Sequence, residues 1–109
     1  MLVSVLKSKL HRICVTEANI DYEGSLTLDP DDMDAVGIVP YEKLLVANVD
    51  NGSRFETYAL AGKRGSGVCC LNGAAARLGK VGDRLIVMAF AGVSPDESAS
   101  CQPKVKHFA

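Results

Sequence analysis

The chain has 109 residues, a length that holds one hydrophobic core, so the sequence predicts a single domain over residues 1–109. Its 12 basic and 13 acidic residues give a net charge of -1, which argues against nucleic-acid binding because the basic excess is missing. Apolar residues make up 48% of the chain, enough for a folded core, but no apolar run approaches the ~20 residues of a membrane span. Without a signal-peptide pattern at the N-terminus, we expect a cytoplasmic protein.

Glycine and proline divide the chain into short segments. The best helix signal is residues 29–37, where Asp29 can cap the helix, Pro30 suits its first position and Gly37 can end it. A turn at residues 50–52 predicts a hairpin, residues 62–67 read as a mobile hairpin loop, and residues 72–77 as a tight turn into a short helical piece. Many short strands with one small helix predict an all-β small barrel or sandwich. The expected strands are residues 9–16, 25–28, 43–49, 54–61, 68–71, 84–90 and 105–108.

The four cysteines do not form a metal-binding pattern. Cys69 and Cys70 are adjacent, so they point to opposite faces of a strand, and both histidines lie far from them in sequence. We therefore expect no metal site, and four buried or half-buried thiols in a reducing compartment.

Residues 21–25 contain the parts for cleavage of the chain by its own side chain. The Ser25 hydroxyl can attack the Gly24 carbonyl and shift the acyl group from nitrogen to oxygen. Glycine has no side chain to crowd that attack and tolerates strained backbone angles. The resulting ester can eliminate, leaving a dehydroalanine that hydrolyses to a pyruvoyl group. Taken alone, a glycine before a serine at the start of a strand is simply a turn.

Seven short motifs, one of which contains Gly24 and Ser25, together support a specific assignment of the chain to a family. In them, over nearly the whole chain, the sequence resembles the family of pyruvoyl-dependent aspartate 1-decarboxylase precursors, with the family's order and spacing. The motifs are Lys9-Leu10-His11-Arg12, Tyr22-Glu23-Gly24-Ser25, Met33-Asp34-Ala35, Asn51-Gly52-Ser53-Arg54-Phe55, Thr57-Tyr58-Ala59, Arg64-Gly65-Ser66-Gly67 and Asn72-Gly73-Ala74-Ala75-Ala76.

The resemblance implies a double-psi β-barrel that assembles as a homotetramer with active sites between subunits. It implies self-cleavage between Gly24 and Ser25, into residues 1–24 and residues 25–109 with an N-terminal pyruvoyl group derived from Ser25. The pyruvoyl carbonyl would form a Schiff base with L-aspartate and accept the electron pair released with the α-carboxylate. The products would be β-alanine, for pantothenate synthesis, and carbon dioxide.

The resemblance also implies roles in substrate binding and turnover. By strand alternation Arg54, Glu56 and Tyr58 share one face. Arg54, helped by Lys9, is expected to hold the β-carboxylate, since holding the departing α-carboxylate would stabilise the ground state. Tyr58 is expected to return the proton after decarboxylation.

Other matched residues are expected at the cleavage site. Thr57 would hydrogen-bond near the Gly24 carbonyl, with His11, Lys9 and Tyr22 close by. Strict alternation puts Thr57 and Tyr58 on opposite faces, so a bulge, a twist or a subunit boundary is needed to bring both into one pocket. Backbone amides in the small-residue segment could hold a carboxylate or the cleavage oxyanion; this segment comprises Asn72, Gly73, Ala74 and Ala75.

The sequence departs from the family's pattern at Ala47, where some members carry a large aromatic residue, and at Arg77, where histidine is common. The chain also ends at Ala109, earlier than many relatives. Two alternatives stay open: a non-catalytic β-barrel binding module, favoured if the bond before Ser25 stays uncut, and a pyruvoyl enzyme for another amino acid, favoured by a different substrate profile. The sequence leaves open whether cleavage needs a maturation factor.

Overall fold

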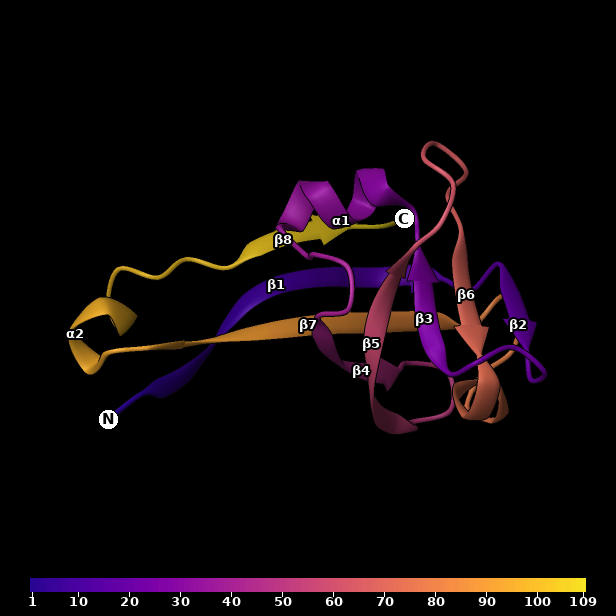
Figure 1. Cartoon of the computed structure of the whole chain (residues 1–109), viewed down its shortest axis with the longest axis horizontal. Coiled ribbons are helices and arrows are strands. Elements are labelled where there is room, and N and C mark those ends of the chain that lie inside the picture. The colour runs from indigo at the N-terminus through magenta and orange to yellow at the C-terminus, as the bar shows by residue number, and fades with distance from the viewer.

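Eight strands form one hydrogen-bonded sheet that wraps around the hydrophobic core, in a computed structural model that describes residues 1–109 (Figure 1). The strands are β1 (Val3–Cys14), β2 (Glu17–Asn19), β3 (Ser25–Leu28), β4 (Lys43–Asn48), β5 (Arg54–Ala61), β6 (Cys69–Asn72), β7 (Arg84–Val93) and β8 (Lys104–His107). Two α-helices, α1 (Pro30–Val36) and α2 (Pro95–Ser98), and one 3-10 helix, η1 (Gly73–Arg77), complete the chain. The strand order is β2-β6-β3-β5-β4-β7-β1-β8.

The sheet closes on itself because β1 continues into β2 after only two residues. β1 pairs with β7 near one end of the strand order, and β2 pairs with β6 at the other. Between them, the amide of Val15 donates to the Asp83 carbonyl at 2.8 Å and that of Thr16 to the Cys69 carbonyl at 2.9 Å. The predicted all-β small-barrel fold is confirmed.

Alternation along the strands decides what lies inside the barrel. In β3, Leu26 and Leu28 are fully buried in the core, while Ser25 and Thr27 face the other side of the sheet. The core is one cluster of 17 buried residues, supplied mainly by the strands and closed by α1. Burial of such apolar side chains contributes roughly 1.5–3 kcal/mol each, so alternation also fixes the register of each strand.

The helix α1 forms where local signals predicted it. The Asp29 side chain accepts a hydrogen bond from the Asp31 amide, Pro30 occupies the first turn, and Gly37 ends the helix in the left-handed region at φ 77°. Strands β3 and β5 also match their predicted bounds. No helix of the chain is long and apolar enough to cross a membrane.

Strand β1 is longer than predicted, since it begins at Val3 rather than Lys9. The extra residues pair with an equally extended β7, from Val3 opposite Val93 onward, so a partner distant in sequence creates this part of the strand. Figure 1 shows the two strands running together well beyond the barrel, toward α2. Sequence analysis missed α2, although a reciprocal capping box between Ser94 and Glu97 marks its start.

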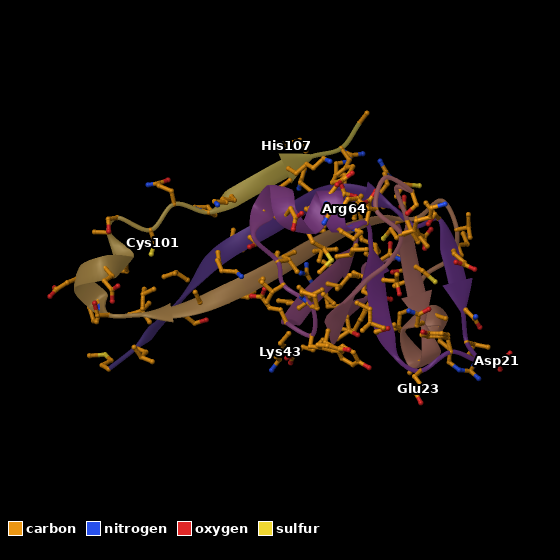
Figure 2. All side chains as sticks on the ribbon, turned by 45° about the horizontal axis from the view of Figure 1, so that its top comes forward. Asp21, Glu23, Lys43, Arg64, Cys101 and His107 are labelled. Atoms are coloured by element: carbon orange, nitrogen blue, oxygen red, sulfur yellow. The ribbon has the colours of Figure 1, made fainter.

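The loop at residues 62–67 is not the mobile hairpin loop that was predicted. Strands β5 and β6 are not neighbours, because β3 lies between them. The Asp29 carboxylate accepts hydrogen bonds from the amides of Gly65 and Gly67, at 3.1 and 2.8 Å. Arg64 reaches back to Asp31 and Asp34 on α1 at 2.7 and 2.9 Å (Figure 2). The loop is therefore fastened to the start of α1.

The cysteines divide into two buried and two exposed thiols. Cys69 and Cys70 are buried as expected, but Cys14 and Cys101 are exposed, which corrects the prediction for those two. Cys14 is the last residue of β1, and Cys101 lies in the connection between α2 and β8. No group of three or more histidine, cysteine or acidic side chains is close enough to hold a metal ion.

Replacing Asp29 by Asn should make stability less sensitive to acid. The hydrogen bond from the Asp31 amide, with those from Gly67 and Gly65 and the nearby Arg64 cation, lowers the pKa of Asp29. A lowered pKa stabilises the fold above the unfolded-state value of about 3.9, and this contribution is lost as the pH falls through the folded-state pKa. Asp29→Asn should therefore melt lower than wild type at neutral pH, by roughly 4–8 °C. The difference in melting temperature between the variant and wild type should be smaller at acidic pH than at neutral pH. An equal difference at acidic and neutral pH would contradict this role for the Asp29 charge.

Candidate functional site

A pocket of about 290 Å³ opens where β3 begins, beside β5 and the start of η1. Three segments distant in sequence meet there, because β3 pairs with both β5 and β6. The pocket brings together seven of the residues predicted for the site: Gly24, Ser25, Thr57, Tyr58, Asn72, Ala74 and Ala75. Phe55, Glu56 and Leu78 complete its lining.

A polar face on strands β3 and β6 adjoins the pocket at Ser25 and Asn72. Ser25 lies opposite Asn72, and Thr27 lies opposite Cys70, so four polar side chains gather on the face turned away from the core. Asn72 Nδ2 donates to Ser25 Oγ at 3.0 Å and to Thr27 Oγ1 at 2.8 Å. The Cys70 thiol donates to Asn72 Oδ1 at 3.1 Å. Ser25 itself is fully buried, so its hydroxyl is held by this network rather than by water.

Sequence analysis assigned no role to Thr27 or Cys70. The signal was present in the alternation of the two strands, where polar Ser25 and Thr27 interleave with leucines. What the sequence did not reveal is that β3 pairs antiparallel with β6, which is the pairing that places Thr27 and Cys70 beside Asn72.

The connection from β2 to β3 crosses tightly over the end of β6. Strands β2 and β3 flank β6, so residues 20–24 must pass over it, at the place where Figure 2 shows Asp21 and Glu23. Gly73 permits the crossing: a Cβ there would lie 2.8 Å from the Gly24 Cα and N and 2.9 Å from the Tyr22 carbonyl oxygen. Its φ of +61° also favours glycine. A Cβ on Gly24, in contrast, would meet no atom within 4 Å.

Thr57 and Tyr58 both line the pocket without a bulge in β5. The pairing of β4 with β5 runs in continuous register through both residues, opposite Leu44 and Lys43. The pairing of β3 with β5, however, starts only at Leu26 opposite Ala59. The pocket lies just before this ladder begins, where the edge of β5 is uncovered and side chains from both faces can reach it. Position at a strand edge thus resolves the conflict with strict alternation.

The structure does not bring Lys9, His11 or Arg54 into the pocket. Lys9 and His11 lie on β1, which β4 and β7 separate from β5 in the strand order. Arg54 is exposed at the start of β5, opposite Ala47, and like Lys9 it has no ion-pair or side-chain hydrogen-bond partner. Tyr22 lines a different cavity, together with Thr27 and Cys70. Gly73 does not line the Ser25 pocket; it lies against the backbone of Gly24 and Tyr22.

His11 sits under the C-terminal strand rather than beside Ser25. It pairs with His107 of β8, and the two rings pack edge to face with centroids 5.5 Å apart. Burial lowers the pKa of His11, and the neighbouring Lys9, His107 and Arg12 act in the same direction. Its Nδ1 is buried without a hydrogen-bond partner, as is Nε of Arg12, whose φ of 71° lies in the left-handed region.

The chain is a small β-barrel whose pocket holds a buried serine directly after an exposed glycine. Comparisons with known proteins identify its family. The family model described as aspartate decarboxylase matches residues 1–109. A protein of Leptospira biflexa named aspartate 1-decarboxylase is 55% identical over 106 residues, covering 96% of this chain and 90% of the relative. Proteins of the same name from Caldicellulosiruptor saccharolyticus and Bacillus subtilis are 54% and 53% identical, covering 96% of this chain and 82% and 83% of the relatives. The chain belongs to the aspartate decarboxylase family.

Adding a methyl group at Gly73 should disturb the crossing, whereas adding one at Gly24 should not. Gly73→Ala places its Cβ against backbone atoms and imposes a left-handed φ, which should lower the free energy of unfolding by about 1–3 kcal/mol. Gly24→Ala is the matched control and should change it by less than ~0.5 kcal/mol. Urea unfolding of both variants in a Ser25→Ala background compares uncut chains. Equal stability of the two variants would contradict the crossing geometry.

Proposed function

We propose that this chain is a self-processing aspartate 1-decarboxylase. It removes the α-carboxylate of L-aspartate to give β-alanine and carbon dioxide, and so supplies β-alanine for pantothenate synthesis. The observation that carries the proposal is the buried Ser25 hydroxyl, held by Asn72 directly after the exposed Gly24 in a pocket with Thr57 and Tyr58. The relatives that share more than half of its residues are named for the same activity.

The processing step uses groups of the chain itself. Ser25 Oγ attacks the Gly24 carbonyl carbon and loses its proton, while the peptide nitrogen leaves as an amine, so that an ester replaces the amide. Elimination then removes the proton from Ser25 Cα and breaks the bond between Cβ and Oγ, which leaves a carboxylate on Gly24 and a dehydroalanine at position 25. Addition of water and loss of ammonia convert this residue to a pyruvoyl group. Gly24 suits the step because its carbonyl is reached without a side chain in the way.

The residues around position 25 fit a pyruvoyl group. Asn72 Nδ2, which donates to Ser25 Oγ, can equally donate to a carbonyl oxygen, and the small side chains of Ala74 and Ala75 leave room beside it. The group would supply the electron sink for loss of carbon dioxide. Tyr58 faces the same pocket with 38% of its surface exposed, so its phenol can return a proton to the substrate carbon. Thr57, which lines the same pocket as Gly24, would hydrogen-bond to the Gly24 carbonyl during cleavage.

A second copy of the chain would supply the positive charge that aspartate requires. The pocket is lined by no cation and contains the acidic Glu56, so one copy alone offers no counter-charge to either carboxylate. Arg54 and Lys9 are free of ion-pair partners and lie outside the pocket. We propose a homotetramer in which a neighbouring subunit brings Arg54, Lys9 and His11 to each pocket, with Arg54 and Lys9 on the β-carboxylate that is retained. Exposed apolar side chains such as Val3, Phe90 and Val105 support such an assembly.

We also propose a cytoplasmic location. None of the four cysteines is paired, and the exposed Cys14 and Cys101 suit a reducing compartment.

Denaturing mass spectrometry of purified protein tests the proposed processing. We expect two fragments, residues 1–24 and residues 25–109, the larger blocked to amine reagents and reactive toward hydrazine because it begins with a ketone. The Ser25→Ala variant should give one intact chain without a reactive carbonyl and without decarboxylase activity. An active wild-type preparation that is uncut would refute the proposal and favour a binding module.

Replacing Tyr58 by Phe should separate processing from turnover. The variant keeps the ring but loses the phenolic proton, so it should still cleave while its kcat on aspartate falls at least ~100-fold. Tyr41→Phe is the matched control: its ring packs against Tyr58 with centroids 6.4 Å apart but does not line the pocket. Steady-state release of carbon dioxide by fully processed variants measures the difference. Full turnover in Tyr58→Phe would assign the proton to another group.

A further inference from the structure

The side-chain amide of Asn72 is the junction of the polar face. Its Nδ2 carries two hydrogens, and the structure uses both, one toward Ser25 and one toward Thr27. Both of these partners are hydroxyls, which donate or accept equally well. They would therefore tolerate the amide turned by 180°, with Oδ1 toward Ser25. The hydroxyls alone do not decide which end of the amide faces the cleavage site.

Cys70 is the partner that distinguishes the two ends of the amide. A thiol donates its S–H to a carbonyl oxygen but is a poor acceptor for an N–H. The Cys70 sulfur lies 3.1 Å from Asn72 Oδ1 and only 5% of the residue is exposed, so water offers little substitute. Burial raises the pKa of this thiol to about 11, and the Glu17 carboxylate acts in the same direction through its charge and a side-chain hydrogen bond. The thiol therefore keeps its proton at neutral pH, and Glu17 and Asn72 Oδ1 are the two side-chain acceptors within its reach.

We propose that Cys70 and Thr27 are positioning residues for self-cleavage: together they hold the Asn72 amide with its N–H directed at Ser25 Oγ. This inference rests on the proposed function and assigns a purpose to two residues that line no part of the Ser25 pocket. Cys70 selects the orientation by donating to Oδ1. Thr27 Oγ1 accepts the second N–H and thereby fixes the rotation of the amide about its own axis.

The orientation of the Asn72 amide matters because negative charge develops on Ser25 Oγ in two steps of the cleavage. Charge builds on this oxygen when its proton leaves as the bond to the Gly24 carbon forms. It builds there again when the bond to Cβ breaks and the oxygen leaves as part of a carboxylate. An N–H donor held at 3.0 Å stabilises both states without having to reorganise, whereas a turned amide would present its own oxygen and repel the charge.

Cys70 on the polar face and its neighbour Cys69 on the core face provide matched variants to test the positioning role. Full-length uncut chain made by cell-free synthesis is incubated, and its conversion to two fragments is followed by denaturing electrophoresis. Cys70→Ala should slow cleavage by roughly tenfold, the effect of one oriented hydrogen bond. Cys70→Ser, which restores a donor, should return the rate to within about threefold of wild type. Cys69→Ala removes the same sulfur from the core face and should lower the melting temperature without slowing cleavage.

A second pair of variants keeps the test decisive if Cys70→Ala folds poorly. Thr27→Val has the same shape without the acceptor and should slow cleavage, while Thr27→Ser should rescue it. Wild-type rates in Cys70→Ala or Thr27→Val would overturn the positioning role, as would equal slowing in Cys70→Ala and Cys70→Ser, since packing alone would then explain the effect. Failure of the wild-type chain to cleave at all would refute the proposed function instead, so the two failures are distinguishable.

Discussion

The antiparallel register of β3 on β6, with Ser25 opposite Asn72, is the constraint on which the rest of the site depends. Because β2 and β3 flank β6, the chain between them must cross the end of that strand, and Gly73 lets the two backbones pass. The crossing brings residue 24 to the surface and residue 25 into the interior within one peptide bond. The strand topology, rather than a flexible loop, therefore positions the carbonyl and the hydroxyl that we propose react with each other.

The register of β3 on β6 also brings the polar side chains of these two strands within hydrogen-bond distance of one another. Burial of polar side chains is costly unless each finds a partner, and here a thiol, an amide and two hydroxyls partner one another. The two buried polar atoms without partners lie elsewhere, on His11 and Arg12 of β1. They adjoin Lys9 on the strand that the proposed assembly would bring to a neighbouring pocket. A buried polar atom without a partner is destabilising, so these two atoms lower the stability of β1 in a single copy of the chain.

Local signals in the sequence predicted the elements whose ends are set locally. Asp29, Pro30 and Gly37 bound α1 through capping alone, and β5 starts and ends at its predicted residues. Pairing across long sequence distances explains the remainder. Strand β1 extends to Val3 because β7 pairs with it, and residues 62–67 are fastened by Asp29, which precedes them by more than thirty residues.

In the candidate site, too, local sequence motifs predicted some features, while others depend on pairing between strands distant in sequence. The motif around Gly24 and Ser25 predicted the bond that is cut, and in the structure Thr57, Tyr58 and Asn72 line the same pocket as these two residues. Alternation predicted that a bulge, a twist or a subunit boundary would be needed to bring Thr57 and Tyr58 into one pocket. The structure brings them together without a bulge, because the pocket lies at an uncovered strand edge. Thr27 and Cys70 were missed since their importance depends on which strand β3 pairs with. The roles of Lys9, His11 and Arg54 stay predictions, as one copy of the chain leaves them apart from the pocket.

The position of the proposed cut also explains how a barrel could lose a peptide bond without opening. Residues 1–24 contain β1, which lies between β7 and β8, and β2, which pairs with β6. Residues 25–109 begin with β3, which is hydrogen-bonded on both sides, by β5 and by β6. The strands on both sides of the cut are therefore held by ladders that do not involve residue 24, and Leu10 and Leu26 belong to one core. A bond cut inside either ladder would release strand pairing, whereas the proposed cut would leave the pairs of β2 with β6 and those of β3 from Leu26 onward in place.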